Sequence, residues 1–318
     1  MHGYGTQIGI VGLPNAGKST LFNGLAARRL SPTAAYPFTT IEPHEAVVLV
    51  PDPCLDSLAV LVRASTPGVE LQILPATVTF IDIAGLVKGA AQGEGLGNQF
   101  LAKIREVDAI VHVVRAFEDP NVVHVHPSVK LGTSGQIKED IEVVNLELEL
   151  AGISKSTIYV VNVGAGQLGS ASNIISLATS VTGGAPVVLV CAKLEEELSD
   201  LSADERADYL KELGLEKSGL EQLIDAAYKM LGLITFYTIK GGRQVRAWSL
   251  KSGSTALSAA ERVHTDFAQN FIKAEVVNVD ELLGCGGWHK AKEAGKVRLE
   301  GRNYVVQDGD VIEFKFGT

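Results

Sequence analysis

The residues with the clearest chemical meaning lie near the N-terminus, where a turn bounded by glycines precedes a lysine and a serine. The run Gly12-Leu-Pro-Asn-Ala-Gly-Lys18-Ser19 has the form GxxxxGK[ST]. It follows an apolar segment, 8–11, and precedes a segment with helical periodicity, 20–27. Glycine lets the backbone curl so that its N–H groups point at phosphate oxygens, and the helix N-terminus adds partial positive charge. In this context the pattern predicts a phosphate-binding loop (P-loop) rather than a chance match in a glycine-rich chain.

Each polar group of this loop has an expected task. Lys18 is predicted to reach the β- and γ-phosphates of a nucleoside triphosphate, and Ser19 to give its hydroxyl to Mg²⁺. The residues expected to contact the nucleotide at this end are Asn15, Ala16, Gly17, Lys18, Ser19 and Thr20.

Two further motifs follow in the order that a nucleotide switch requires. Asp82-Ile-Ala-Gly85 has the form DxxG and comes directly after an apolar run, so Asp82 is predicted to orient Mg²⁺ through water and Gly85 to offer its N–H to the γ-phosphate. Between the P-loop and DxxG lies Tyr36-Pro-Phe-Thr-Thr40. Thr40, rather than Thr39, is predicted to close over Mg²⁺ and the γ-phosphate as a switch; the alternative is an ordinary turn around Pro37.

The pattern of apolar runs predicts the fold that positions these motifs. Valine and isoleucine runs alternate with helical patterns through the first 230 residues, which favours an α/β domain with a doubly wound sheet. The predicted strands are 8–11, 46–50, 78–81, 109–114, 158–161 and 187–190, with helices at 203–213 and 220–231. After Gly232, short strands and turns predict a small α+β module, with strands at 234–238, 244–250, 273–277, 297–299, 304–306 and 311–316. The predicted domains are therefore 1–232, which binds nucleotide, and 233–318.

Composition and charge narrow the functional classes. The 318 residues are 46% hydrophobic and carry a net charge of −9, which is typical of a globular protein. Residues 233–318 hold 12 basic and 10 acidic residues, whereas residues 1–232 hold 16 and 27. The acidic body argues against broad nonspecific nucleic-acid binding, and a solvated surface is the simpler interpretation of the charges. There is no run of 18 apolar residues, no secretory signal pattern and no cysteine-based metal motif, so a cytoplasmic protein without membrane contact is expected.

Several stretches together resemble the Obg-like ATPases of the YchF type. They are IVGLPNAGKSTLFN at 10–23, YPFTTIEP at 36–43, PDPCLDSL at 51–58, FIDIAGLVKGAAQGEGLGNQFLAKIRE at 80–106, HVVRAFED at 112–119 and YVVQDGDVIEFKF at 304–316. The resemblance covers nearly the whole chain. It implies a Ras-like P-loop NTPase domain followed by a TGS module with a β-grasp fold. It also implies hydrolysis of ATP in preference to GTP, association with ribosomes, and a surface of the TGS module that faces RNA.

The chain departs from the family in two places. The family carries a long antiparallel helical arm in the nucleotide domain, but here the corresponding region, near 130–157, is too short to hold one. Ordinary GTPases also carry NKxD after the fifth strand, and the family resembles this with NxxE. Here the run is Asn162-Val-Gly-Ala165, so the acid that selects the base is missing and guanine selectivity should be poor. Asn162 is predicted to bind nucleotide with Val163; the alternative is that it only caps the strand. Ala192 and Lys193, in a loop that resembles the family's SAKxE, are the further predicted contacts with the base.

The same residues set expectations for the mechanism. Leu86 stands where Ras-like enzymes have the glutamine that orients the attacking water, so hydrolysis should be slow. Asn15 occupies a position that holds K⁺ in some related proteins, or it only braces the loop. Arg115 and His112, near the end of a predicted strand, are expected to be surface residues. The glycine-rich stretch 85–97 is expected to be a mobile switch rather than a loop shaped for packing.

We therefore expect an ATPase that uses Mg²⁺, and K⁺ if Asn15 holds it, and that acts as a ribosome-associated switch. Lys18, Thr40 and Gly85 are the predicted catalytic residues, and Ser19, Thr40 and Asp82 (through water) are the predicted metal-binding residues. Two alternatives stay open at this point: a GTPase of ribosome biogenesis, and an adapter that binds nucleotide without significant turnover.

Overall fold

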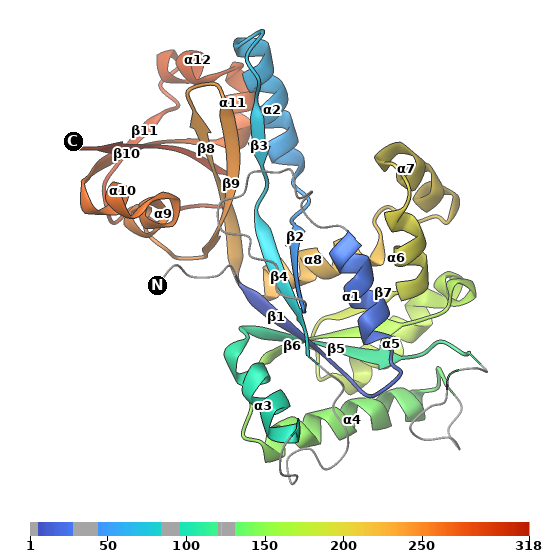
Figure 1. The fold of residues 1–318 in the computed structure, drawn as a ribbon. Coiled ribbons are helices and arrows are strands. Elements are labelled where there is room, and N and C mark those ends of the chain that lie inside the picture. Colours follow the sequence, from blue (N-terminus) through green and yellow to red (C-terminus); the bar gives the residue numbers. More distant parts are fainter. Residues whose placement is uncertain (1–5, 28–43, 84–95, 120–121, 123–130, 318) are drawn as a thin grey trace. The chain divides into compact units, whose positions relative to one another are not determined.

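The structure is a computed structural model, and it describes residues 6–27, 44–83, 96–119, 122 and 131–317. The chain divides into two compact units (Figure 1). The first contains residues up to Leu49 and Val78–Leu231, and the second contains Val50–Thr77 and Gly232–Thr318. The division thus places residues 50–77 with the C-terminal unit, whereas the division expected from the sequence, at residue 232, leaves them in the N-terminal part.

The first unit is built on a six-stranded sheet with the order β2-β4-β1-β5-β6-β7. Its strands are β1 (Gln7–Val11), β2 (Glu45–Leu49), β4 (Thr77–Asp82), β5 (Ala109–Arg115), β6 (Ser156–Asn162) and β7 (Val187–Val190). From β4 to β7 all neighbouring strands are parallel. All seven residues of β5 are buried, as expected for a parallel strand covered on both faces.

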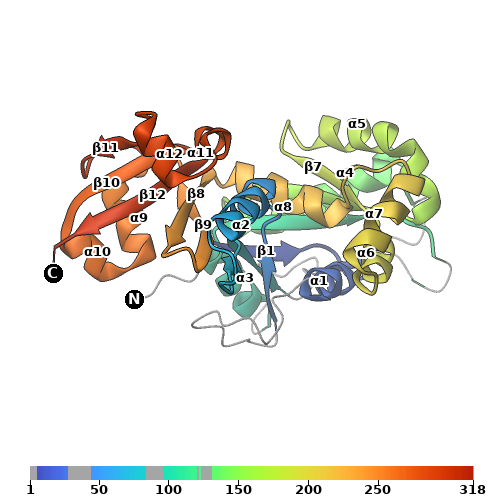
Figure 2. The ribbon, with the colours of Figure 1, turned by 90° about the horizontal axis from the view of Figure 1, so that it is seen from above.

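Helices cover both faces of this sheet (Figures 1 and 2), so the predicted doubly wound architecture is confirmed. On one face, α3 (Leu96–Glu106) and α4 (Ser134–Leu150) bury Leu101, Ile104 and Val144 against Val11 and Ile110. The other helices of the unit are α1 (Lys18–Ala27), α5 (Ala171–Val181), α6 (Ala192–Ser199), α7 (Ala203–Glu212) and α8 (Gly219–Met230), with a short 3₁₀ helix, η1, at Ala165–Ser170.

The region expected to lack a helical arm holds one helix in its described part. α4 ends at Leu150 and β6 begins at Ser156, so five residues connect them. Within residues 131–155 no second helix accompanies α4, and the connection is too short for an antiparallel helical pair.

The second unit contains a six-stranded mixed sheet with the order β11-β10-β12-β8-β9-β3. Its strands are β3 (Gln72–Leu74), β8 (Leu233–Lys240), β9 (Gln244–Lys251), β10 (Phe271–Asn278), β11 (Arg298–Glu300) and β12 (Asp310–Phe316). β8–β9 and β10–β12 are antiparallel, whereas β12–β8 and β3–β9 are parallel. α9 (Ala256–Val263) packs against this sheet around Phe236, Ala260 and Phe314, an arrangement typical of a β-grasp fold. The remaining helices are α2 (Pro53–Ser65), α10 (Thr265–Gln269), α11 (Val279–Cys285) and α12 (Trp288–Glu293).

The strand predicted at 304–306 is wrong. Val305 forms only an isolated bridge with Thr255, and the Tyr304 hydroxyl donates instead to the buried Asp310 carboxylate at 2.8 Å. Among the helices of the described ranges, none has the combination of length and apolar character needed to cross a bilayer.

Candidate functional site

The predicted P-loop connects the end of β1 to the first turn of α1, and its backbone requires glycine at both ends. Gly12 and Gly17 have φ angles of 151° and 92°, in the region that disfavours residues with a side chain. A Cβ on Gly12 would lie 2.4 Å from the carbonyl oxygen of Val113, and a Cβ on Gly17 would lie 2.1 Å from Nδ2 of Asn162. Asn15 also has a positive φ, of 61°, which asparagine tolerates better than most residues. The sequence therefore folds into the tight loop that the motif predicts.

Lys18 lies inside this loop and not in solvent. Its side chain is 8% exposed, and Nζ donates to the carbonyl oxygen of Leu13 at 2.8 Å. Burial lowers the pKa of the Lys18 ammonium, and the Asp82 carboxylate opposes this shift. Asp82 is the last residue of β4 and pairs with Ile10 of β1, one residue before β1 ends, so the structure brings Lys18 and Asp82 together. A cationic group held at a helix N-terminus beside a carboxylate suits a phosphate chain and its Mg²⁺.

The other residues predicted to contact the nucleotide at the P-loop differ in exposure. Ser19 and Thr20 are in the first turn of α1, Ser19 exposed and Thr20 half-buried, while Ala16 is buried and Asn15 is exposed. Among the described residues, His, Cys, Asp and Glu form no group of three or more that could hold a metal. Mg²⁺ bound with a nucleotide needs only one or two protein ligands because phosphate and water supply the rest. Ser19 and Asp82 fit that donor set.

Asn162 ties two distant segments to each other. It is 4% exposed at the end of β6; its Nδ2 donates to the carbonyl oxygen of Ala16, and its Oδ1 accepts from the backbone N–H of Ala192, both at 3.0 Å. These bonds span 146 and 30 residues along the chain. Asn162 therefore fixes the P-loop against the N-terminus of α6, a larger structural role than capping its own strand.

The residues predicted to surround the base differ in exposure. Val163 is 2% exposed, packs in the core and donates its N–H to Val190. Ala165 is exposed at the start of η1, and Lys193 is exposed in the first turn of α6. The side-chain amide of Gln167, two residues after Ala165, is hydrogen-bonded at both ends. Its Oε1 accepts from the N–H of Gly164 at 2.8 Å, and its Nε2 donates to the carbonyl oxygen of Ala116 at 3.1 Å. Contact of Val163, Ala192 or Lys193 with a nucleotide stays a prediction, and Thr40, Gly85 and Leu86 lie outside the described residues.

The expectation that His112 and Arg115 are surface residues is wrong, since each is 1% exposed. The Arg115 guanidinium donates to the carbonyl oxygens of Phe117, Asp119 and Val122, at 3.2, 3.4 and 3.0 Å, and lies 4.5 Å from the centroid of the Phe117 ring. This role of Arg115 is not visible in the sequence, because the three carbonyls become its partners only when the chain turns after β5. Arg115 thereby shapes the segment whose Phe117 ring lies 3.7 Å from the Cβ position of Gly17.

His112 lies in β5 opposite Val11, the last residue of β1, and neither of its ring nitrogens has a hydrogen-bond partner in the described structure. Its ring is 5.3 Å from the ring of Tyr159. Burial, and secondarily the charge of Lys18, lower the pKa of His112 from 6.5 to about 3. The imidazole is therefore neutral in the folded protein over the whole physiological range.

This pKa shift predicts a specific loss of stability in acid. Below pH 6.5 the unfolded chain binds a proton at His112 that the folded protein does not bind, so stability falls as the pH decreases from 6.5 towards 3. The slope of the free energy of unfolding against pH approaches about 1.4 kcal/mol per pH unit, and the free energy of unfolding falls by about 2 kcal/mol between pH 7.5 and 5. In His112→Leu this part of the pH dependence should vanish, as measured by urea unfolding at a series of pH values. His289→Gln, at an exposed position, should keep the slope of the wild type. An unchanged slope in His112→Leu would show that the folded protein accommodates the imidazolium.

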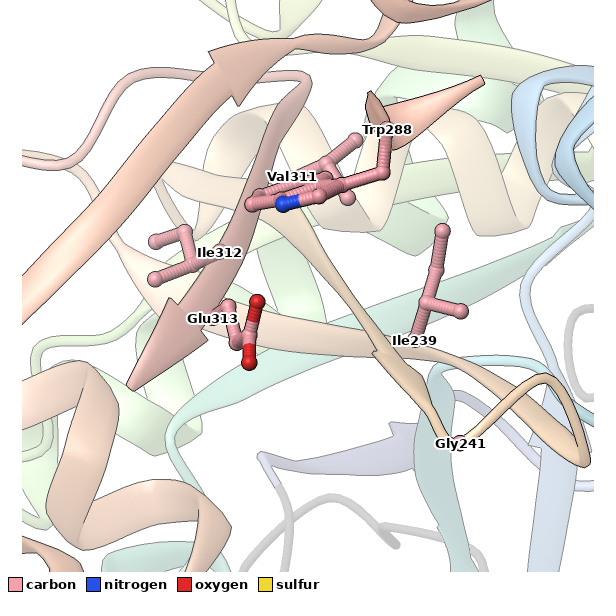
Figure 3. Close-up of a pocket in the computed structure, with 6 residues that line it drawn as sticks. All are labelled: Ile239, Gly241, Trp288, Val311, Ile312 and Glu313. Carbon is pink, nitrogen blue, oxygen red and sulfur yellow. The ribbon is translucent and has the colours of Figure 1, made fainter. Parts of the chain in front are cut away.

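The second unit contains a pocket of about 170 Å³, drawn in Figure 3. Its lining residues are Ile239, Gly241, Trp288, Val311, Ile312 and Glu313. Its lining combines apolar side chains with polar atoms, and the Glu313 carboxylate forms an ion pair with Lys315. Because this lining offers no cation to a phosphate, the pocket does not compete with the P-loop as a nucleotide site.

The fold and the P-loop together define a nucleotide-binding protein of the P-loop GTPase class, with a second sheet unit at its C-terminus. A family model described as "50S ribosome-binding GTPase" matches residues 7–163, and a YchF C-terminal model, described as "Protein of unknown function (DUF933)", matches residues 233–317. The protein of Bacillus subtilis named "Ribosome-binding ATPase YchF" is 41% identical over 98% of this chain and 99% of its own length. The protein of that name from Escherichia coli O157:H7 is 39% identical over 99% of this chain and 100% of its own length.

A solved structure agrees with these similarities. The structure of the Schizosaccharomyces pombe YchF GTPase covers 98% of both chains with a TM-score of 0.79 and 29% identity. The chain belongs to the YchF family. The alignment with the Bacillus subtilis protein extends over 377 residues against the 318 of this chain, so at least 59 aligned positions have no residue here. This difference agrees with the single helix, α4, found in the described residues 131–155.

Proposed function

We propose that this protein is a cytoplasmic ATPase that hydrolyses ATP slowly with Mg²⁺ and signals its nucleotide state to the ribosome. The observation that carries the proposal is the buried Lys18 ammonium, held inside the P-loop beside Asp82. This geometry prepares a cation for a triphosphate before the ligand arrives, because desolvated charges interact more strongly than charges in water. The names of the full-length relatives, which call them ribosome-binding ATPases, support the choice of nucleotide and partner.

In the proposed reaction, water attacks the γ-phosphorus of ATP, and the bond between that phosphorus and the oxygen bridging to the β-phosphate breaks. ADP leaves with the bridging oxygen, the water oxygen stays on the phosphorus as inorganic phosphate, and one proton passes to solvent. Lys18 and the P-loop amides would neutralise charge on the β- and γ-phosphates, and Ser19 and, through water, Asp82 are the residues that would hold Mg²⁺. Thr40 and Gly85 complete the γ-phosphate site. When Mg²⁺ is bound it draws off further charge from the phosphates.

Leu86 and Asn15 set the expected rate of turnover, the first by slowing it and the second by making it depend on K⁺. Leu86 cannot hydrogen-bond the attacking water, so the chemical step loses the orienting group that glutamine supplies in Ras-like enzymes. Asn15 is exposed on the P-loop, where its side-chain oxygen would help to hold a K⁺ ion beside the phosphates. We therefore infer stimulation by K⁺. By family resemblance, the ribosome and an RNA-facing surface of the second unit are the proposed partners.

The test is phosphate release from ATP with Mg²⁺, measured with K⁺ or Na⁺ and with or without ribosomes. Slow release that K⁺ and ribosomes accelerate is expected. No release under any of these conditions would leave an adapter that binds nucleotide without turnover.

Hydrolysis of GTP is the second candidate, because Ala165 removes the carboxylate that distinguishes bases in NKxD and NxxE proteins. Without it, ATP and GTP should bind with dissociation constants within about tenfold of each other, a difference of about 1.4 kcal/mol or less. If the base lies at the end of β6, Ala165→Asp should raise the affinity for GTP relative to the affinity for ATP. A wild-type affinity for GTP more than tenfold above that for ATP would favour a GTPase.

A further inference from the structure

The order of the strands around the P-loop indicates which side of the site receives the nucleoside. β1, which leads into the P-loop, lies between β4 and β5 in the first sheet. Asp82, proposed to hold Mg²⁺ through water, is the last residue of β4, so the metal and the γ-phosphate belong on that side. Ligands of open α/β sheets bind beyond the carboxyl ends of the strands. The nucleoside is therefore expected on the other side of β1, beyond the ends of β5, β6 and β7.

The segment that follows β5 is hydrogen-bonded to the end of β6. The two strands end opposite each other, since Arg115 pairs with Asn162. The backbone N–H groups of Ala116 and Phe117 both donate to the carbonyl oxygen of Asn162, at 2.8 and 3.0 Å. The Phe117 ring lies 3.7 Å from the Cβ position of Gly17. The segment after β5 therefore lies between the end of β6 and the P-loop.

The side-chain amide of Gln167 joins this segment to the one that follows β6. Its Nε2 donates to the carbonyl oxygen of Ala116, and its Oε1 accepts from the N–H of Gly164. The backbone N–H of Gln167 also donates to the carbonyl oxygen of Gly164, at 2.9 Å. Because one partner of the amide is an acceptor and the other a donor, its two ends cannot be exchanged. The amide is thus a brace of fixed orientation between two backbone segments.

The segment that Gln167 braces offers a base no polar side chain. Ala165 stands where NKxD and NxxE proteins carry an acid, and both it and Gly166 are exposed. Recognition at residues 164–166 therefore depends on backbone N–H and C=O groups and on shape. Two of these three residues are glycine, whose backbone is the least restricted of all residues. Precise placement of the segment thus requires a group outside it, and Gln167 supplies one.

We propose that Gln167 is a positioning residue for the nucleoside part of the bound nucleotide. Its amide holds residues 164–166 against Ala116, and the base and ribose are received beside these backbone segments. Gln167 acts through the backbone and does not itself bind the base. Because the segment is fixed before the ligand arrives, binding costs less conformational entropy. This inference rests on the proposed function, since it requires a nucleotide held at the P-loop.

A comparison of ATP with inorganic tripolyphosphate separates this role from a general structural one. Both ligands carry the three phosphates that the P-loop is proposed to bind, but only ATP carries a base and a ribose. Gln167→Met keeps the length of the side chain and loses both hydrogen bonds of the amide. Its affinity for ATP should fall about tenfold, a size that two lost hydrogen bonds can account for. Its affinity for tripolyphosphate should stay within about twofold of the wild type, because Lys18 is unchanged. Isothermal titration calorimetry with Mg²⁺ gives both dissociation constants.

Matched variants accompany this measurement. Gln167→Ala removes the same two hydrogen bonds and should give the same result, and it replaces Gln167→Met should that variant fold poorly. Gln222 is an exposed glutamine in α8 of the same unit, and its Nε2 donates to the carbonyl oxygen of Lys217 at 3.2 Å. Gln222→Ala should bind both ligands as the wild type does. Circular dichroism and urea unfolding show which variants are folded.

Each outcome bears on one of the two proposals. Failure of the wild type to bind either ligand would refute nucleotide binding at the P-loop. Unchanged ATP affinity in the folded Gln167 variants would overturn the positioning role alone. An equal fall in affinity for ATP and tripolyphosphate would overturn it as well, since Gln167 would then support the whole loop. If the wild type bound tripolyphosphate as tightly as ATP, the nucleoside would contribute nothing for Gln167 to position.

Discussion

In Lys18→Ala, affinity for ATP should fall at least about 100-fold and phosphate release should stop, while the fold is retained. Removal of one preorganised donor typically costs a factor of about 10²–10³ in rate, and loss of one partner of a buried charge pair costs about 2–5 kcal/mol in binding. Lys18 is such a donor: it is nearly buried, and it is held in place by the Leu13 carbonyl at 2.8 Å before a ligand binds. The measurement is a fluorescence titration with labelled nucleotide, together with a phosphate-release assay.

Stability should not follow affinity in this variant. Burial disfavours the Lys18 ammonium, as its lowered pKa indicates, so removing the charge relieves a desolvation cost in the free protein. Circular dichroism and urea unfolding should therefore show an intact fold with similar or greater stability.

Lys18→Met, which keeps the apolar stem, should bind ATP as poorly as Lys18→Ala. Lys193→Ala changes an exposed lysine of the predicted base loop and should reduce ATP affinity by less than about tenfold, since a solvated cation contributes little. ATP binding of wild-type strength in Lys18→Ala would remove the basis of the proposed function.

The parts of the structure that could be predicted from the sequence depend on local patterns. β5 and β6 were predictable because continuous Val and Ile runs are typical of strands covered on both faces, and the P-loop because its glycines are required by its own backbone. The residues 50–77 were not assigned to the second unit, because the hydrogen bond from the Tyr237 hydroxyl to the Asp52 carboxylate spans 185 residues and leaves no local periodicity.

The burial of polar residues next to strand ends also could not be predicted from local sequence patterns. Arg115, expected at the surface, is buried, and three carbonyl oxygens from the following turn receive its N–H groups and so offset the cost of burying a guanidinium. Those partners come from backbone, which carries no signal in the sequence. For the same reason the sequence could indicate Asn162 as a site residue but could not predict its two backbone partners.

Asn162→Ala should weaken both the fold and nucleotide binding, because one side chain serves two distant backbone groups. The substitution leaves the carbonyl of Ala16 and the N–H of Ala192 without their partner in a site that is 4% exposed. Each unsatisfied buried group costs about 1–3 kcal/mol, so the free energy of unfolding should fall by about 2 kcal/mol or more. Affinity for ATP should fall about tenfold, a loss of about 1.4 kcal/mol, because Ala16 is held in the loop that cradles the phosphates.

Two further substitutions distinguish the loss of these two hydrogen bonds of Asn162 from a general loss of packing. Asn162→Asp keeps an acceptor for the N–H of Ala192 but sets a carboxylate oxygen against the carbonyl of Ala16, so it should bind ATP at least as weakly as Asn162→Ala. Asn145→Ala removes an exposed asparagine whose Nδ2 donates to the Tyr159 hydroxyl at 3.1 Å. It should lower stability by about 1 kcal/mol, the usual contribution of one hydrogen bond, and leave ATP affinity unchanged. If Asn162→Ala lost stability but bound ATP as the wild type does, Asn162 would only join α6 to the sheet. The geometry favours a role in nucleotide binding, because Nδ2 of Asn162 contacts the P-loop at two residues. It donates to the carbonyl oxygen of Ala16, and it lies so near Gly17 that a Cβ there would be 2.1 Å away, so only glycine fits at this position of the loop.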